Sequence, residues 1–308
     1  MKLWLHYLIY SPKIVGLHTI YIRNTQINQK EIMTYYTILG SQGYVGSHLV
    51  KKLRQRNIEY ICPKRDEILT RQNYGHIIYC VGLTADFRTR PFDTIEAHVC
   101  KLKNILRDCE FESLVYLSST RVYKNRHDIG NEDDPLEINP NDCDDLYNIS
   151  KLMGESLCNV SPKKTYILRL SNVYGNDVHS SNFLSGVIRD ALNKKKITLT
   201  VTLNSEKDYV SIHDVTDLIL CITEKGRYPV YNVASGRNIT NLEIINKIKE
   251  LTSCNVIVAQ NAKKIIFPKI NITKIREEFS FSPSFLIDDF QNVFNDFKAI
   301  NSNYHNSN

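Results

Sequence analysis

The feature that most constrains this chain is a glycine-rich turn between a short apolar run and an amphipathic stretch. Residues 35–39 form a strand-like run, the turn reads Gly40-Ser41-Gln42-Gly43-Tyr44-Val45-Gly46, and apolar residues at helical spacing follow it. A tight glycine turn at a helix N-terminus favours phosphate binding, because the backbone can approach closely and the helix end is positively polarised. The spacing is G-x-x-G-x-x-G, however, and not the common G-x-G-x-x-G. Taken alone, the turn leaves pyrophosphate binding and a plain structural turn equally open.

Short apolar runs alternate with helical patterns along most of the chain after Thr34. The strand-like runs cover residues 58–62, 77–81, 114–117 and 165–170, and helical stretches include 94–109 and 146–160. This alternation is typical of parallel βαβ units, whose sheet is buried on both faces. We therefore predict an α/β fold built on a doubly wound parallel sheet. The rhythm becomes less regular after Gly175, which indicates a smaller C-terminal α/β region.

Composition and charge exclude several classes of protein. The formal net charge of the 308 residues is only +6. Residues 1–32 contain four basic residues and one acidic residue, so this segment accounts for half of the net positive charge. The rest lacks the basic stripe of a nucleic-acid-binding protein. No segment approaches the roughly 18 apolar residues of a membrane span, and the eight cysteines form no C-x-x-C pair. We therefore expect a cytoplasmic protein with no nucleic-acid or membrane partner and no metal site.

The helix predicted near residues 146–160 carries a Y-x-x-x-K pattern formed by Tyr147 and Lys151. Residues four apart share one helix face, so the ammonium group lies beside the phenol. A neighbouring cation favours the phenolate, whose ordinary pKa of about 10 is too high for easy proton exchange at neutral pH. The pair is therefore a candidate acid–base group, although the same pattern is common on solvated helix faces.

Hydroxyl side chains follow the strand-like run 114–117, in the order Ser118, Ser119 and Thr120. Ligands of parallel sheets bind at the carboxyl ends of strands, where a hydroxyl can hydrogen-bond a substrate oxygen as charge develops on it. A turn rich in serine and threonine is the structural alternative. The glycine turn, the hydroxyls and the Tyr-Lys pair each stand on the element that their role requires, which favours the functional interpretation.

Together these motifs resemble the extended short-chain dehydrogenases/reductases of the NAD-dependent epimerase/dehydratase family, which act on nucleotide sugars. Three later segments also resemble motifs of that family: residues 168–175 (LRLSNVYG), 207–215 (KDYVSIHDV) and 231–236 (YNVASG). The similarity runs from about Thr34 to Phe297. It implies a Rossmann-type doubly wound parallel sheet with a smaller C-terminal α/β substrate-binding region.

The resemblance implies a role for each matching residue. Tyr147 would transfer the proton, and Lys151 would hold the nicotinamide ribose and lower the pKa of the tyrosine. Ser119 takes the place of the family's catalytic Ser or Thr. Asn172 and Lys207 would contact the phosphates of the nucleotide sugar, the lysine standing where the family often has an arginine. The cofactor pyrophosphate would lie on the turn and the first helical residues, Gly40, Gly43, Tyr44, Val45 and Gly46.

Departures from the family pattern narrow the expected reaction. Family dehydratases and decarboxylases usually carry an acidic residue just before the Val-Tyr pair, where this chain has Thr120 and Arg121. We therefore favour an NAD(P)-dependent nucleotide-sugar epimerase or 4-keto-sugar reductase, with hydride transfer and Tyr147 as acid/base. A dehydratase of the same family and a noncatalytic cofactor-binding or regulatory protein are the alternatives. His98 takes the place of a family asparagine, and the sequence does not reveal the consequence.

The end of the second strand-like run bears on cofactor choice. Lys64 and Arg65 stand near the position where an acidic residue would bind the ribose 2′-hydroxyl of NAD. Two cations suit a 2′-phosphate, so NADP(H) is slightly favoured over NAD(H). A solvated loop that touches no ligand is the alternative.

The loop after the strand-like run 77–81 should also border the cofactor cleft. Gly82 is the expected cofactor contact there, and Thr84 the expected substrate contact. Asp86 and Arg88 either line the pocket or form an ion pair with each other, and we favour the ion pair. The sequence identifies neither the sugar nor the nucleotide.

The resemblance also indicates how the chain is organised. Residues 1–32 form an extension before the first strand, and a translation start at Met33 is favoured over a genuine extension. The remaining parts are a dinucleotide-binding domain at 33–175 with a return segment at about 205–235, a substrate-binding region at 176–204 and 236–298, and a frayed tail at 299–308. Helices at about 94–109 and 146–159 would pair two copies in a homodimer.

Overall fold

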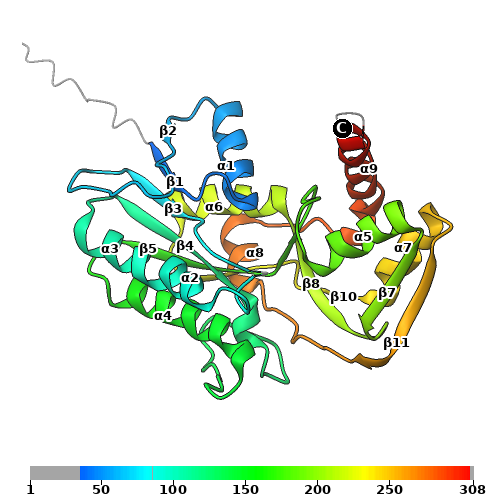
Figure 1. Cartoon of the computed structure of the whole chain (residues 1–308). Coiled ribbons are helices and arrows are strands. Elements are labelled where there is room, and N and C mark those ends of the chain that lie inside the picture. Colours follow the sequence, from blue (N-terminus) through cyan, green and yellow to red (C-terminus); the bar gives the residue numbers. More distant parts are fainter. Residues whose placement is uncertain (1–34, 85, 306–308) are drawn as a thin grey trace, which may run out of the picture. The chain divides into compact units, whose positions relative to one another are not determined.

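The computed structural model describes residues 35–84 and 86–305, with the backbone alone for residues 301–305. The predicted extension at 1–32 and the proposed start at Met33 lie outside the described residues. Within the described part, two sheets of different size and a separate strand pair are covered by helices, as Figure 1 shows.

A six-stranded parallel sheet forms the larger part of the fold, as the alternating pattern predicts. Its order is β2-β1-β3-β4-β5-β9, so the chain winds outward in both directions from β1 and β3. Its strands in chain order are β1 (Tyr36–Leu39), β2 (Tyr60–Ile61), β3 (His76–Tyr79), β4 (Ser113–Ser119), β5 (Thr165–Leu170) and β9 (Val230–Val233). The prediction of a Rossmann-type doubly wound sheet is confirmed.

Helices cover both faces of this sheet. One layer comprises α1 (Tyr44–Gln55) and α6 (Ile212–Lys225), and the other comprises α2 (Pro91–Ile95), the π-helical turn η1 (Glu96–Cys100), α3 (Lys101–Asp108) and α4 (Leu146–Val160). The strands serve both layers because successive side chains point to opposite faces. In β1, Ile38 packs with Leu49 and Leu53 of α1, whereas Leu39 packs with the core of the α3 layer.

The smaller unit begins after β5, where the chain leaves the large sheet. Its three-stranded sheet has the order β10-β8-β6, and β7 pairs in parallel with β11. The elements are β6 (Asn172–Tyr174), α5 (Phe183–Lys194), β7 (Lys196–Val201), β8 (Glu206–Ser211), β10 (Asn238–Thr240), α7 (Asn241–Leu251), β11 (Asn255–Lys263) and α9 (Leu286–His305). Helix α8 (Thr273–Phe279) packs instead against β9 of the large sheet. Helix α9 continues through residues 299–305, the stretch that the sequence predicted as a frayed tail. Thr240 and Glu243 form a capping box at the start of α7.

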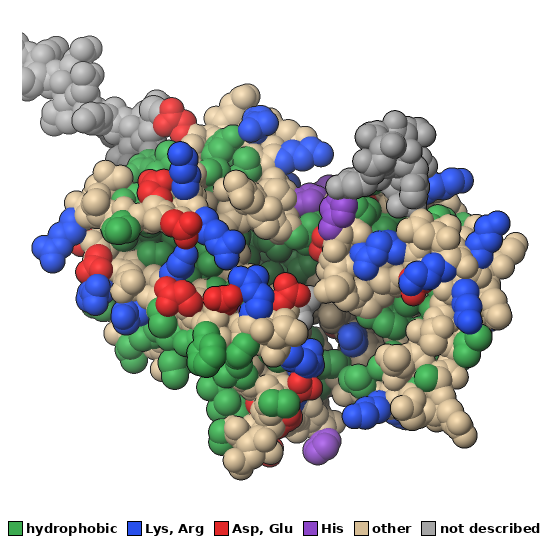
Figure 2. Space-filling view, viewed as in Figure 1, with side chains coloured by type: hydrophobic (Ala, Val, Ile, Leu, Met, Phe, Trp, Pro, Cys, Tyr) green, Lys and Arg blue, Asp and Glu red, His purple; other side chains and the backbone are tan. Residues whose placement is uncertain are grey.

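The surface between the two sheets is hollowed in the view of Figure 2, and basic and acidic side chains are interspersed around the hollow. The smaller unit has its own core, in which Phe290 of α9 and Ile244 of α7 are fully buried. Among the described residues, no helix has the length and apolar character needed to cross a bilayer. The same residues hold no cluster of three or more His, Cys, Asp or Glu side chains arranged for a metal ion.

Candidate active site

The carboxyl ends of three neighbouring parallel strands bring the predicted site residues to one edge of the large sheet. Strand β1 ends just before Gly40, β3 ends shortly before Gly82, and β4 ends at Ser119. These strands pair in the order β1-β3-β4. Tyr147 and Lys151 reach the same edge from α4, since the Lys151 ammonium donates a hydrogen bond to the carbonyl of Leu117 in β4 at 2.8 Å.

The glycine turn after β1 is closed so tightly that side chains are excluded from it. Gly40 has a φ of +82°, and a Cβ at Gly46 would lie 2.3 Å from the Gly40 carbonyl oxygen. Gly43 is the N-cap of α1, where no side chain caps the helix and no acidic residue occupies the first turn. The N–H groups at this helix end therefore keep their capacity to bind an anion, which fits the pyrophosphate of a dinucleotide.

Tyr147, Ser119 and Lys151 form a group in which the first and last are buried and Ser119 is half-buried. Tyr147 and Lys151 are each only 4% exposed. The Ser119 side chain lies near enough to the Tyr147 hydroxyl to act to lower its pKa, and it accepts a hydrogen bond from the Arg121 backbone N–H at 3.1 Å. The Lys151 ammonium lies 6.0 Å from the centroid of the Tyr147 ring. The group thus combines a hydroxyl that can exchange a proton, a second hydroxyl that orients it, and a nearby cation.

Burial dominates the electrostatics of this group. It raises the pKa of Tyr147, whereas the hydrogen bond from Ser119 and the positive charge of Arg121 act to lower it. Burial also lowers the pKa of Lys151 to about 7, against the opposing effect of Glu155. Lys151 is therefore poised between its charged and neutral forms near neutral pH. Any anionic group placed beside it favours the charged form and, through it, the phenolate of Tyr147.

A buried ion pair stands behind Lys151 on the same face of α4. The Glu155 carboxylate binds the Arg169 guanidinium at 2.7 Å, and it also accepts a hydrogen bond from Ser118 at 2.5 Å. Sequence reasoning did not single out Glu155. The signal was present, because Tyr147, Lys151 and Glu155 recur every four residues and so share a helix face.

His98 holds the loop after β3 against α4. Its Nδ1 lies 2.8 Å from the Ser150 hydroxyl, which donates its own proton to the Tyr147 carbonyl, so Nδ1 is the protonated nitrogen. Its Nε2 accepts the Leu83 N–H at 3.2 Å. Burial and the charge of Lys151 lower the pKa of His98 to about 2. The residue is therefore neutral, and both ring nitrogens are engaged within the protein.

The loop that His98 holds brings Gly82 to the predicted site. A Cβ at Gly82 would lie 3.1 Å from His98 Nε2 and 3.4 Å from the Lys151 ammonium nitrogen. Thr84 is exposed in the same loop. The predicted pairing of Asp86 with Arg88 is wrong, because Arg88 pairs with Asp144 at 2.6 Å, a residue brought close by the turn before α4.

The other predicted ligand residues lie around this centre. Lys64 and Arg65 are exposed after β2, and within the described residues neither side chain forms an ion pair. Asn172 opens β6 and donates a hydrogen bond to the Asp208 carbonyl at 2.9 Å. Lys207 lies in β8 with its ammonium group about 6 Å from the rings of Phe183 and Phe267.

Tyr44 and Val45 contribute their backbone to the N-terminal turn of α1. The Tyr44 side chain turns instead toward β6, where a Cβ at Gly175 would lie 2.3 Å from the Tyr44 hydroxyl oxygen. That hydroxyl is buried without a hydrogen-bond partner. The Tyr44 backbone therefore fits the predicted phosphate site, whereas the Tyr44 side chain lies at the junction between the two sheets.

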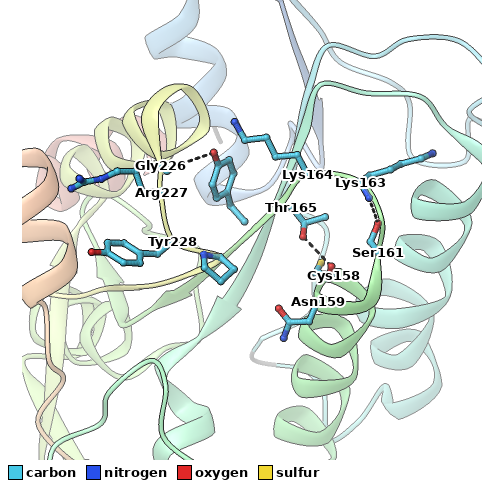
Figure 3. Close-up of a pocket in the computed structure, with 11 residues that line it drawn as sticks. Cys158, Asn159, Ser161, Lys163, Lys164, Thr165, Gly226, Arg227 and Tyr228 are labelled. Atoms are coloured by element: carbon cyan, nitrogen blue, oxygen red, sulfur yellow. Dashed lines mark hydrogen bonds between the residues drawn. The ribbon is translucent and has the colours of Figure 1, made fainter. Parts of the chain in front are cut away.

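A cavity of about 320 Å³ lies at the opposite edge of the large sheet. Figure 3 shows its lining, which comes from the end of α4, the start of β5 and the loop before β9. Cys158, Thr165 and Gly226 are among these residues, and none of the predicted site residues belongs to them. Parallel sheets bind ligands at the carboxyl ends of their strands. The cavity faces the amino ends and is therefore separate from the candidate active site.

Comparison with known proteins agrees with the fold and the motifs. The NAD dependent epimerase/dehydratase family matches residues 36–234, well over half of the chain. The chain belongs to this family. The match includes the glycine turn, Ser119, Tyr147 and Lys151.

Individual members of the family are similar at low identity. A dTDP-4-dehydro-6-deoxy-D-allose reductase of Streptomyces sp is 21% identical over 257 residues, which cover 68% of this chain and 79% of that protein. The structure of MoeE5 in complex with UDP-glucose and NAD is similar with a TM-score of 0.73 at 17% identity, covering 86% of this chain and 98% of that one. RMD from Pseudomonas aeruginosa complexed with NADPH gives a TM-score of 0.70 at 18% identity, over 86% of this chain and 99% of that one.

Proposed function

We propose that this member of the NAD dependent epimerase/dehydratase family is an NAD(P)-dependent nucleotide-sugar epimerase or 4-keto-sugar reductase, with Tyr147 as its acid/base. The observation that carries the proposal is the buried group of Tyr147, Ser119 and Lys151 at the carboxyl edge of the sheet. In this group the Ser119 side chain acts to lower the pKa of the tyrosine hydroxyl, and the Lys151 ammonium is held by the Leu117 carbonyl.

Each residue of the group has a distinct task in this proposal. The Tyr147 hydroxyl gives a proton to, or takes one from, the sugar oxygen at the carbon that changes oxidation state. Ser119 fixes that oxygen and the tyrosine in one geometry, because its hydroxyl can both donate and accept. Lys151, in its charged form, stabilises the phenolate that remains when Tyr147 has given up its proton.

A nicotinamide dinucleotide fits the surroundings of this group. The closed turn at Gly40 and Gly46 and the uncapped start of α1 suit its pyrophosphate. When bound, the nicotinamide would exchange a hydride with the sugar carbon. NADP(H) remains slightly favoured, since Lys64 and Arg65 are exposed after β2 and form no ion pair with the residues that the structure describes. The smaller unit, at 176–204 and 236–298, would hold the nucleotide sugar.

The alternatives lack a comparable observation. A dehydratase of this family needs a carboxylate beside the reacting sugar, and Thr120 and Arg121 occupy those positions. A noncatalytic cofactor-binding or regulatory protein would have no use for the buried Tyr147–Ser119 contact. The buried lysine with a pKa near 7 is likewise costly to maintain without a chemical role.

We also propose a homodimer through the helices at about 94–109 and 146–159. On α4, Met153 is 49% exposed and Val160 is 75% exposed, and Phe92 of α2 is 87% exposed. Exposed apolar side chains on and next to the proposed interface helices favour a protein interface, since α2 and α4 are in contact. Sedimentation of the purified protein tests this proposal, with a mass of twice the chain expected and a monomer at micromolar concentration contradicting it.

Cofactor identification after purification, followed by turnover of a panel of nucleotide sugars, tests the proposed function. Retained NAD(H) favours an epimerase, which oxidises and re-reduces the same substrate and never needs to release its cofactor. A site that arrives empty and binds NADPH favours a reductase. Dinucleotide binding without turnover of any nucleotide sugar would contradict the proposal and support the noncatalytic alternative.

A further inference from the structure

Arg121 is a partly buried cation at the reacting end of the site. It belongs to the turn η2 (Thr120–Tyr123), directly after Ser119. Its guanidinium carbon lies 5.5 Å from the centroid of the Phe87 ring, and the same ring lies 5.3 Å from the ring of Tyr147. Phe87 is only 3% exposed. Arg121 and Tyr147 therefore both lie against one buried aromatic ring.

The charge of Arg121 has no counter-ion within the described residues. Its buried Nε finds no hydrogen-bond partner. The two carboxylates whose charges reach it are both engaged elsewhere: Asp144 pairs with Arg88 at 2.6 Å, and Asp145 pairs with Lys124 at 2.6 Å. A desolvated charge without a partner is costly. Buried polar groups in native proteins almost always have a hydrogen-bond partner. A bound ligand that accepts a hydrogen bond from Arg121 would explain why this one has none in the protein.

A second cation, Lys207, lies in β8, near enough for the charge of Arg121 to act on it. Its ammonium lies 6.0 Å from the Phe183 ring and 5.8 Å from the Phe267 ring. It forms no ion pair among the described residues. Burial and the positive charge of Arg121 both lower the pKa of Lys207, so the two cations repel each other. An anion bound between them would relieve this repulsion.

We propose that Arg121 binds a carboxylate on the sugar ring that Tyr147 acts on. The planar guanidinium matches a carboxylate through two parallel hydrogen bonds. Arg121 shares Phe87 with Tyr147, which places it beside the reacting sugar and favours a sugar carboxylate over the substrate diphosphate. The inference rests on the proposed function, since it requires a nucleotide sugar at Tyr147. It narrows the substrate class to acidic nucleotide sugars.

Calorimetric titration of the dinucleotide-loaded protein tests this inference. The probes are UDP-glucuronic acid, UDP-glucose and UDP, with the dTDP counterparts in parallel. The wild-type protein should bind the carboxylated sugar more tightly than the neutral one. Arg121→Met should weaken binding of the carboxylated sugar roughly 10- to 100-fold, and leave the neutral sugar and the free nucleotide unchanged. Lys164→Met is the matched control, because it removes an exposed charge at the opposite sheet edge.

Each other outcome has a distinct meaning. If Arg121→Met weakens the binding of all probes equally, including the free nucleotide, then Arg121 binds the diphosphate. That result would overturn the proposal that it binds a sugar carboxylate. Arg121→Met binding every probe like the wild type would overturn any role in ligand binding. A wild-type protein that binds no nucleotide sugar would contradict the proposed function itself.

Thermal unfolding without ligand gives a second readout. Since Arg121→Met removes an unpaired, partly buried charge, its Tm should equal or exceed that of the wild type. A fall of several degrees would show that Arg121 serves the fold, and would also overturn the inference.

Discussion

The buried pair of Glu155 and Arg169 behind Lys151 supports a quantitative prediction. The two side chains are only 5% and 6% exposed, and Arg169 Nε lies 3.1 and 3.2 Å from the two carboxylate oxygens of Glu155. Glu155→Gln keeps the shape of the side chain and an acceptor for Ser118. It leaves the Arg169 charge desolvated without a counter-ion. Breaking a buried pair in this way should lower the free energy of unfolding by roughly 3–5 kcal/mol.

Urea unfolding followed by circular dichroism measures this loss. The matched control is Glu110→Gln, because Glu110 is 69% exposed and pairs with Lys163 at 3.5 Å. An exposed pair contributes about 0–1 kcal/mol, so the control should unfold almost like the wild type. The double variant Glu155→Gln/Arg169→Met removes both charges and should lose less stability than Glu155→Gln alone.

A small effect would refute the reasoning. If Glu155→Gln lowers the free energy of unfolding by no more than the Glu110→Gln control, the Glu155 carboxylate is hydrated and the pair is not buried as described. If the loss of unfolding free energy in the double variant equals the sum of the losses in Glu155→Gln and in Arg169→Met, the two side chains are not coupled.

Three further predictions concern the glycine turn, Lys151 and His98. Gly46→Ala should reduce dinucleotide binding and Tm, because its Cβ would lie 2.3 Å from the Gly40 carbonyl oxygen. Gly186→Ala in α5 meets no atom within 4 Å and should leave dinucleotide binding unchanged and Tm unchanged or slightly raised, since alanine favours a helix over glycine. Because the folded pKa of Lys151 is about 7 and the ordinary value is 10.5, unfolding takes up a proton between these pH values. The free energy of unfolding should therefore rise with pH across this window by up to about 1.4 kcal/mol per unit relative to Lys151→Met, and parallel stability curves of the two proteins would contradict this. The pKa of His98 is lowered from 6.5 to about 2, so wild-type stability should fall faster than that of His98→Gln as pH drops below 6.5, and equal acid sensitivity in urea unfolding would show that His98 is solvated.

The parallel sheet could be predicted because its signals are local. Each buried strand is a short apolar run, and each helix repeats its apolar residues along one face. The predicted bounds at 165–170 and 146–160 agree with β5 and α4. The spacing of Tyr147 and Lys151 and the place of Ser119 at a strand end follow from the same local geometry, which is why the structure brings them together.

The remainder depends on contacts between distant segments. Strand β7 pairs with β11, which lies more than fifty residues later, and neither strand is marked by local turn chemistry. Arg88 pairs with Asp144 instead of its neighbour Asp86, because the fold brings the turn before α4 to the loop after β3. The missing counter-ion of Arg121 is also a tertiary property. The sequence shows only that no carboxylate stands at that position.

Turnover by Tyr147→Phe tests the central claim most directly. The variant loses one hydroxyl in a pocket where the ring itself is packed against Phe87 and His98, so the fold and dinucleotide affinity should be preserved. With the nucleotide sugar that the wild-type protein converts, kcat should fall at least roughly 100-fold, which is the contribution of a positioned acid/base. A variant that keeps the wild-type kcat would contradict the assignment of proton transfer to Tyr147.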